Sequence, residues 1–320
     1  MVDKQSLSQS TSTTIVGTLP HWRVLFWGTY GLFSQVVLTE LYLAGVQLCG
    51  VIVPGDGETA VSPPIQSLKP KSNPSTLPLL NPFVNKSILQ VAWTKDIPVF
   101  AVNDLTADET QKTIRSLQPE LACVACFNKR IPPALLTIPT RGFWNLHPSL
   151  LPDYRGPTPL FWMLRAGIQN VGVTIHQMDE NFDTGDILLQ TAFKLNDGIR
   201  GPEADEVFAK QGSGLLLAAL QGVAEDKIVP KPQPTGGSYF SWPQTDDFQI
   251  PTTWSARHAF NFMRSTAEWK QPFRIYGPDS DITARFAIEF DPEAKIKRAL
   301  KWNGRDVTIQ FNPGTLHVTT

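Results

Sequence analysis

The sequence has little cysteine, no long apolar run and no excess of charge of either sign. Three cysteines among 320 residues do not suffice for a disulfide framework, and the apolar neighbours of Cys49, Cys123 and Cys126 predict buried thiols in a reducing compartment. No stretch reaches the roughly 18 apolar residues of a membrane span. The 28 basic and 29 acidic residues nearly cancel, which excludes binding to nucleic acid or membrane surfaces through net charge alone. We expect a cytoplasmic protein without a membrane partner, either a monomer or a weak oligomer.

Length and composition predict two folded domains after an N-terminal tail. Hydrophobic residues make up 42% of the chain, enough for one large domain and one small domain. Residues 1–20 are rich in Ser and Thr and lack the basic start and apolar core of a secretory signal, so we expect a disordered tail. Prolines gather between residues 228 and 251 and indicate a connection between domains. We therefore place the large domain at 21–235 and the small one at 236–320.

Strand and helix patterns alternate through the large domain. This alternation predicts the α/β class, with a doubly wound, mostly parallel sheet and helices on both faces. One stretch, 54–82, is rich in Pro, Ser and Lys without a sustained period, and we expect a long surface loop there. The expected strands lie at 23–28, 46–53, 97–102, 120–127, 142–147 and 171–178.

The small domain shows a different pattern. A short helix capped by Ser255 is expected first, followed by a strand over 282–290 in which apolar and polar residues alternate. The turn sequences Asn303-Gly304 and Asn312-Pro313-Gly314 separate further short strands. We expect a small, mostly β, barrel-like module.

Two short motifs resemble known binding motifs, but neither is expected to be a functional site. The glycines after the first strand, Gly28 and Gly31, lack the G-x-G-x-x-G spacing of a dinucleotide site. Cys123 and Cys126 have the C-x-x-C spacing of a redox or zinc site, but residues three apart on a strand point to opposite faces and no second Cys/His pair accompanies them. We expect core thiols and no metal site.

Three polar residues form a stronger candidate site. Asn145 and His147 are two residues apart on an expected strand, so their side chains share a face near the strand's C-terminal end, where open α/β sheets bind ligands. The rigid loop 148–152 follows directly. Asp183 lies in a polar turn after a strand that should run beside the first. His176 on that strand either lines the site or has a structural role.

The segments NLHPSLLPDYRGPTP and GVTIHQMDENFDTGD, taken together, resemble the folate-dependent formyltransferase family, most closely the methionyl-tRNA formyltransferases. The resemblance implies a formyltransferase-like variant of the Rossmann fold and 10-formyltetrahydrofolate as co-substrate, without a metal. It implies catalytic roles for Asn145, His147 and Asp183. The residues it assigns to folate binding are Cys126, Phe127, Asn128, Ile131, Pro132, Ser149, Leu150, Leu151, Pro152, Asp179, Thr184 and Gly185.

Formyl transfer explains why these residue types are needed. An uncharged amine attacks a formamide-like carbonyl, and the tetrahedral intermediate carries negative charge on its oxygen. We expect Asn145 and a protonated His147 to donate hydrogen bonds to that oxygen. A carboxylate beside a histidine raises its pKa, so Asp183 is expected to keep His147 charged and to assist proton transfer. The sequence leaves open whether His147 or Asp183 takes the proton.

The acceptor of the formyl group is less well defined. Members of the family that act on tRNA carry a basic loop after the second strand, whereas here the only cations of that loop, Lys69 and Lys71, are offset by two acids. From residue 241 onward ten Lys and Arg face nine Asp and Glu, where a tRNA-docking module would be basic. Residues 128–130 are also more charged than the family pattern. Methionyl-tRNA is the first expected acceptor, with a nucleotide-linked amino sugar, water, or a non-catalytic folate-binding role as alternatives.

Overall fold

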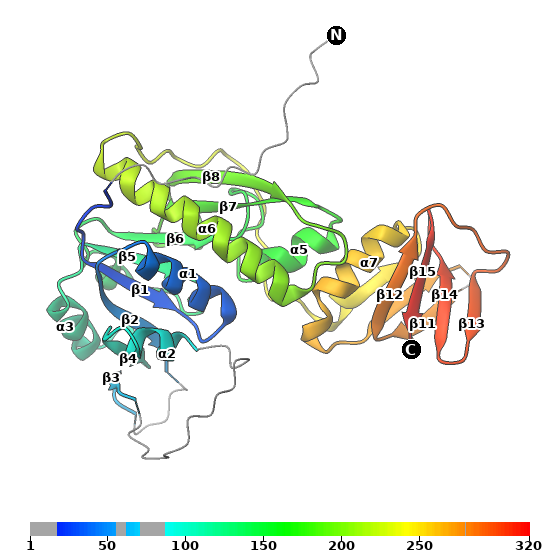
Figure 1. Ribbon diagram of the computed structural model, residues 1–320, viewed down its shortest axis with the longest axis horizontal. Helices are drawn as coiled ribbons and strands as arrows, with labels where there is room; N and C mark the ends of the chain where they lie inside the picture. Colours follow the sequence, from blue (N-terminus) through cyan, green and yellow to red (C-terminus); the bar gives the residue numbers. More distant parts are fainter. Residues whose placement is uncertain (1–17, 56–61, 71–86, 279) are drawn as a thin grey trace, which may run out of the picture.

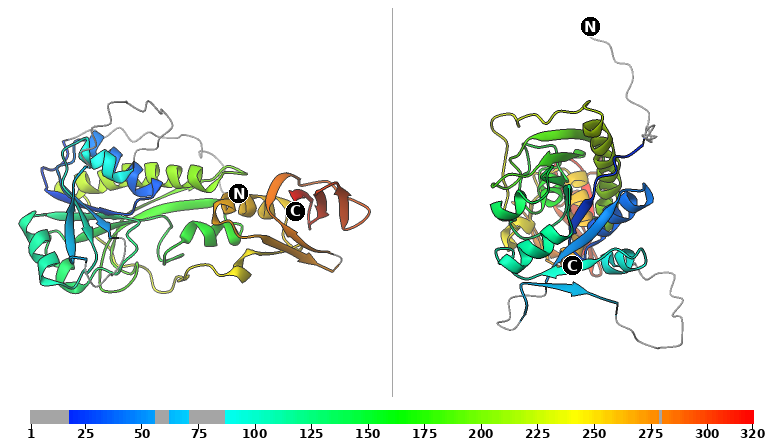
Figure 2. Two further views of the ribbon diagram at one scale, coloured as in Figure 1. Left: turned by 90° about the horizontal axis from the view of Figure 1, so that it is seen from below. Right: turned by 90° about the vertical axis from the view of Figure 1, so that its left-hand side faces the viewer.

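The computed structural model describes residues 18–55, 62–70, 87–278 and 280–320, and it shows an elongated molecule with two unequal parts (Figure 1). The larger part is an eight-stranded sheet between helices. The smaller part is built of short strands and lies at one end of the sheet (Figure 2). The expected tail at 1–20 falls largely outside the described residues.

The large sheet has the strand order β3-β4-β2-β1-β5-β6-β7-β8 and confirms the predicted doubly wound, mostly parallel fold. Strands β1 and β5 are buried along their whole length, which is typical of central parallel strands covered on both faces. Three strands run antiparallel to their neighbours: β3 Ile65–Leu68, β7 Asn170–Gln177 and β8 Ile187–Lys194. The parallel strands are β1 Val24–Gly28, β2 Leu48–Pro54, β4 Val99–Val102, β5 Leu121–Ala125 and β6 Phe143–His147.

Helices cover both faces of this sheet. On one face α1 (Leu32–Leu43) and α6 (Gly201–Ala224) pack side by side, with α2 (Ile88–Trp93) beside α1 (Figure 1). The opposite face is covered by α3 (Asp108–Ser116) and α4 (Pro133–Leu136). Alternate residues of β1 therefore belong to two separate apolar cores.

Two parts of the large domain differ from the expected elements. The stretch 54–82 contains β3, which pairs with the outer side of β4, so it is not loop throughout. Only Ile65 of this four-residue strand is buried, and its two apolar residues, Ile65 and Leu68, are three apart and do not alternate, so they give no strand signal. Residues 56–61 and 71–86 of the region, including Lys71, lie outside the described residues. Strand β8 was not among the expected strands, because seven of its eight residues remain partly or fully exposed and only Leu188 is buried in this edge strand.

The smaller part confirms the expected mostly β module, built from two sheets. Its helix α7 (Ala256–Ser265) begins at Ser255, whose hydroxyl accepts a hydrogen bond from the backbone of His258 at 3.2 Å, as expected for the cap. The strands are β9 Gln249–Pro251, β10 Phe273–Gly277 and β11 Ser280–Ala284 in one sheet, and β12 Phe286–Asp291, β13 Leu300–Asn303, β14 Asp306–Gln310 and β15 Thr315–Thr319 in the other.

The single strand expected over 282–290 is wrong. The chain leaves one sheet after Ala284, which pairs with Phe273, and joins the other at Phe286, which pairs with Thr319. Arg285 lies between the two strands. The alternation of apolar residues continues across this point, although Phe286 and Ile288 are exposed and Ala287 is the buried residue of β12. The change of sheet therefore leaves no trace in the sequence.

The two parts share one continuous apolar core. Helix α5 (Pro159–Arg165) packs against α7, and the ring of Phe161 contacts the rings of Phe248, Phe262 and Trp269 at 5.2 to 5.4 Å between centroids. The segment after α6 returns along the sheet to reach the smaller part (Figure 2). This return path brings residues 231–240 close to the end of β6.

Candidate active site

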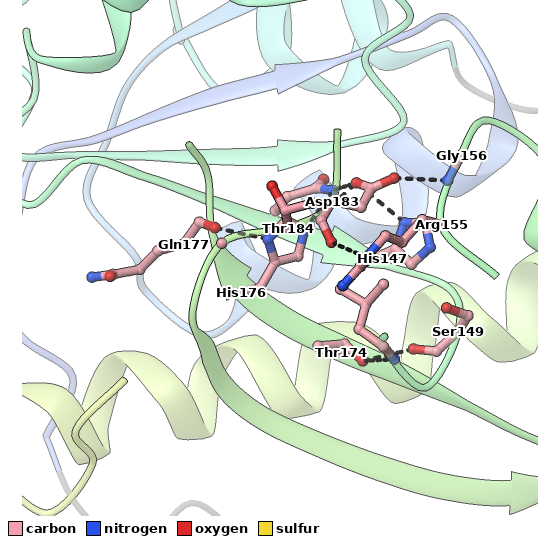
Figure 3. Close-up of polar contacts among 12 residues, drawn as sticks. His147, Ser149, Arg155, Gly156, Thr174, His176, Gln177, Asp183 and Thr184 are labelled. Atoms are coloured by element: carbon pink, nitrogen blue, oxygen red, sulfur yellow. Dashed lines mark hydrogen bonds and ion pairs between the residues drawn. The ribbon is translucent and has the colours of Figure 1, made fainter. Parts of the chain in front are cut away.

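The pairing of β6 with β7 brings the polar residues of the site together. Asn145 lies opposite His176, and His147 lies opposite Thr174, at the C-terminal end of β6. The turn that follows β7 folds back so that Asp183 reaches both strands (Figure 3). The structure thus brings together Asn145, His147 and Asp183, and adds His176 to them.

Asp183 is the centre of the cluster. Its Oδ1 lies 3.3 Å from Asn145 Nδ2, 3.6 Å from His147 Nδ1 and 3.6 Å from His176 Nε2. Its Oδ2 accepts a hydrogen bond from the backbone N–H of Gly156 at 2.9 Å. The backbone of Asp183 is left-handed, with φ of 57°.

The carboxyl group of Asp183 is ionised in this setting. Burial by itself would raise its pKa, but the neighbouring His147 and His176 and the N–H of Gly156 lower the pKa well below the usual range of an aspartate. Its side chain is 14% exposed, so little water screens these contacts. Asp183 is a fixed negative charge at the end of β6.

The environment of His147 corrects the expected charge state. Burial lowers the pKa of this imidazole, and it outweighs the opposing effect of Asp183. The lowered pKa favours the neutral imidazole at neutral pH, where the sequence led us to expect a protonated one. Its Nε2 lies 2.9 Å from the carbonyl oxygen of Tyr154, which only accepts, so Nε2 carries the hydrogen. Nδ1 then has a free lone pair, facing the site.

Asn145 uses both of its amide hydrogens within the cluster. One N–H points to Asp183 Oδ1 and the other to His176 Nε2, 3.1 Å away. His176 donates from Nδ1 to the carbonyl oxygen of Gln177 at 2.7 Å, which leaves its Nε2 as an acceptor. The sequence left the role of His176 open. Its place opposite Asn145 follows from the register of two antiparallel strands, which the sequence pattern alone did not specify.

The loop after β6 is held by buried hydrogen bonds. The hydroxyl of Thr174 donates to the carbonyl oxygen of Ser149 at 2.7 Å and accepts from the N–H of Leu151 at 3.1 Å. The side chains of Ser149 and Leu151 are buried, and those of Leu150 and Pro152 are partly buried. The structure places all four residues in the loop that directly follows His147, and their contact with folate stays a prediction.

The expected folate loop begins one residue after β5. Cys126 lies outside the strand, with φ of 59°, and it is exposed, so the expectation of two buried core thiols is wrong for this residue and holds for Cys123. The strand ends because the backbone turns left-handed here. Phe127 packs edge-on against Trp27 at 5.1 Å between centroids, Ile131 is buried, Pro132 precedes α4, and Asn128 is exposed.

The two charged residues of this loop donate hydrogen bonds to backbone carbonyl groups of other segments. Lys129 Nζ donates to the carbonyl oxygen of Asn103 at 3.0 Å, and Arg130 donates to that of Glu180 at 2.5 Å. The second tie joins the loop to the turn that holds Asp179, whose carboxylate accepts from the Thr184 hydroxyl at 2.8 Å. The two segments assigned to folate by resemblance are therefore neighbours.

Within the described residues there is no cluster of three or more His, Cys, Asp or Glu side chains placed to hold a metal ion, and no helix long and apolar enough to cross a membrane.

Comparison with known proteins agrees with the geometry of the cluster. The model of the family described as formyl transferase matches residues 58–219, just over half of the chain. This chain belongs to the formyl transferase family. The match includes β6, β7 and the turn that holds Asp183, so the cluster lies inside the region of the chain that matches the family.

Individual proteins and solved structures are also similar to this chain. The methionyl-tRNA formyltransferase of Thermodesulfovibrio yellowstonii is 36% identical over 182 residues, 57% of this chain and 59% of that protein. That of Marinobacter nauticus is 29% identical over 256 residues, 80% of this chain and 76% of that protein. An N-formyltransferase from Helicobacter canadensis, solved with folinic acid and dTDP-3-aminofucose, has a TM-score of 0.63 at 16% identity and covers 92% of this chain and 98% of its own. This chain thus spans about 59% of the length of the first relative, and the solved structure shares its fold.

Proposed function

We propose that this protein transfers the formyl group of 10-formyltetrahydrofolate to an amine, with His147 as the general base. The observation that carries the proposal is the pairing of a neutral His147, whose free Nδ1 faces the site, with an ionised Asp183 at 3.6 Å. A base must be unprotonated before it acts and stabilised once it is charged. Burial keeps His147 unprotonated before the reaction, and the Asp183 carboxylate stabilises the imidazolium once it forms.

The reaction is a transfer through a tetrahedral intermediate. The amine nitrogen attacks the formyl carbon and gives its proton to Nδ1 of His147, while the carbonyl oxygen becomes an anion. The imidazolium is then held between Asp183 Oδ1 and the carbonyl oxygen of Tyr154. The proton passes to the departing folate nitrogen as the carbon–nitrogen bond breaks, which yields the formylated amine and tetrahydrofolate. This route assigns the proton to His147 and leaves Asp183 ionised throughout.

Asn145 is the proposed donor to the oxyanion. In the free protein one of its N–H groups meets the neutral Nε2 of His176 and the other meets the charged Asp183. A hydrogen bond between neutral partners is the weaker of the two. Because the two N–H groups of a planar amide cannot turn separately, we expect the N–H that faces His176 to share its hydrogen with the developing anion while the other stays on Asp183.

The proposed folate site comprises the loop 126–132, the loop 149–152 and the turn 179–185. Their arrangement supports this assignment, because Arg130 ties the first segment to the third and Thr174 fixes the second beside them. Bases and ring systems need flat apolar surface together with polar groups at the edge. Phe127 and Leu150 offer apolar surface there, and Asn128 and Asp179 offer polar groups.

Methionyl-tRNA is the first proposed acceptor, since methionyl-tRNA formyltransferases are among the proteins to which this chain is similar. A nucleotide-linked amino sugar is the second candidate. It is favoured by the near-balance of ten basic and nine acidic residues from residue 241 onward, because a small acceptor needs only one or two phosphates neutralised. We propose that the protein acts in the cytoplasm as a monomer or weak oligomer.

A single assay tests these alternatives. Purified protein is supplied with 10-formyltetrahydrofolate and, in separate reactions, methionyl-tRNA, a set of nucleotide-linked amino sugars, or buffer alone. We expect formyl transfer to one amine at a rate far above release of formate in buffer. Release of formate at the same rate in all reactions would identify a hydrolase, and folate binding without turnover in any reaction would leave only a binding role.

A further inference from the structure

Residues 231–240, here called the strap, join α6 to the smaller part and lie against the catalytic cluster. At its start Lys231 exchanges two backbone hydrogen bonds with Ile187 of β8, at 2.8 and 2.9 Å. At its end Phe240 donates to the carbonyl oxygen of Arg155 at 2.9 Å. The strap is thus fixed at its start to β8, the neighbour of β7, and at its end to the loop that follows β6.

The fit of the strap depends on two close backbone approaches. A Cβ atom on Gly156 would lie 2.0 Å from the carbonyl oxygen of Phe240, and one on Gly237 would lie 2.2 Å from that of Pro152. Both glycines also have positive φ, 110° and 90°. Gly156 is the residue whose N–H binds the carboxylate of Asp183. The strap therefore packs directly on the backbone that surrounds the catalytic carboxylate.

One side chain of the strap reaches the backbone of the catalytic turn itself. Gln233 Nε2 donates to the carbonyl oxygens of Asp183 at 2.8 Å and of Gly185 at 2.9 Å. Its Oε1 accepts from the guanidinium of Arg155 at 2.7 Å, and Arg155 Nε in turn donates to the Asp183 carbonyl at 3.1 Å. Carbonyl oxygens only accept and a guanidinium only donates, so the orientation of the Gln233 amide is unambiguous.

This contact acts on a residue with an unfavourable backbone. The left-handed region is sparsely populated by residues other than glycine, so Asp183 stays at φ of 57° only because its surroundings hold it there. Its carbonyl group receives two donors, from Gln233 and Arg155. Rotation of that peptide would break both hydrogen bonds and would move the carboxylate away from His147.

We propose that Gln233 is a positioning residue of the reaction, which holds the left-handed turn of Asp183 so that its carboxylate stays against His147. The inference rests on the proposed function only for its effect on turnover. The strap also supports His147. Phe240 stacks on Tyr154 at 5.5 Å between ring centroids, and the carbonyl oxygen of Tyr154 accepts a hydrogen bond from His147.

The first test compares Gln233→Met with a matched control, Gln47→Met. Methionine keeps the length of the side chain and removes the donors. Gln47 is an exposed residue just before β2, at the end of the parallel strands opposite to the cluster. Misplacement of a catalytic group by about 1 Å costs on the order of 10²-fold in rate. We expect kcat to fall about 10- to 100-fold in Gln233→Met, with little change in the KM for folate, and wild-type values in the control.

The second test measures a property that a loss of stability would not change. His147 is faced by the charged or titratable groups of Asp183, His176 and Arg155. If the Asp183 carboxylate moves away, the group that favours the imidazolium is lost and the pKa of His147 falls further. We expect the acid limb of kcat/KM to move to lower pH in Gln233→Met. Titration of the His147 ring by NMR, assigned with His147→Gln, should show the same shift without any substrate.

The two readouts separate this inference from the proposed function. If the wild-type protein transfers no formyl group, the proposed function fails, while the NMR titration still decides the role of Gln233. Gln233→Glu has the same shape, retains the contact to Arg155 and places an oxygen against the carbonyl oxygens of Asp183 and Gly185. This variant replaces Gln233→Met in both measurements if the methionine variant does not fold. An unchanged kcat together with an unchanged His147 titration in a folded variant would overturn the inference.

Discussion

The two parts of the molecule treat polar groups in opposite ways. At the end of β6 the polar side chains are nearly buried, and His147, His176 and Asp183 each have defined partners. In the smaller part, pairs such as Arg274 with Asp281 are more than half exposed, where water screens them. Buried polar clusters fix geometry, whereas exposed ones are easily exchanged. We propose that the large domain carries out the reaction and that the smaller part selects the acceptor.

The sharpest way to break this division is to remove the catalytic imidazole or amide. We expect His147→Ala or Asn145→Ala to lower kcat by about 10²–10³-fold, because each removes a group that acts only in the transition state. His317→Ala, a change of the same kind on β15 in the smaller part, serves as the control and should leave the rate unchanged. Rates and melting curves measured together check this. Near-normal turnover in either catalytic variant would refute the mechanism.

Reversal of charge in the smaller part tests whether this part binds the acceptor. Four exposed cations lie around the connection from β12 to β13: Lys295, Lys297, Arg298 and Lys301. If methionyl-tRNA is the acceptor, changing all four to Glu should reduce transfer to it by about 10²-fold at moderate salt, since phosphate contacts are lost. Transfer to a small amine should persist. Equal rates with tRNA before and after the change would show that this connection does not dock tRNA.

The pH profile sharpens the description of the buried cluster. Burial lowers the pKa of His147, so its imidazole becomes charged only at acidic pH, and the base is lost there. We expect kcat/KM to stay level from neutral pH downward and then to fall about tenfold for each further pH unit. The depressed pKa of Asp183 adds stability that is present above the pKa of an unfolded aspartate and lost as pH falls through the lowered value. A midpoint of the acid limb above the ordinary histidine pKa would contradict this assignment.

The smallest expected effects separate two neighbouring cysteines. Cys123 is fully buried in β5, and burial raises the pKa of its thiol, whereas Cys126 is exposed beyond the strand. Cys123→Ala should lower the free energy of unfolding by about 1 kcal/mol, and Cys126→Ala by less than about 0.5 kcal/mol. Cys123→Ala should not alter activity per folded molecule, whereas Cys126→Ala is compared for stability and zinc content only, because Cys126 belongs to the proposed folate loop. Chemical denaturation measures the free energies of unfolding, and elemental analysis measures bound zinc. Stoichiometric zinc in the wild-type protein that is lost in the variants would show that the two cysteines bind a metal.

Sequence patterns were informative where a segment is buried on both faces or where turn chemistry is specific. The runs at β1, β5 and β6 predict central strands, Ser255 predicts a helix start, and Asn303-Gly304 predicts a hairpin between β13 and β14. The pair of Asn145 and His147 could be placed on one face because side chains alternate along a strand. Edge strands with a single buried residue, such as β3, gave no such signal.

What the sequence by itself determined is the chemistry available: the residue types of the cluster, their order and the strands that carry them. The tertiary structure decided how that chemistry is tuned. Burial of His147 depends on residues from several strands and loops, and it reversed the charge state expected from Asp183 alone. The pairing of Asn145 with His176 depends on strand register, and the hold of Gln233 on Asp183 joins residues 50 apart in the chain. Desolvation and long-range hydrogen bonds are properties of the folded surroundings, which no local pattern of residues encodes.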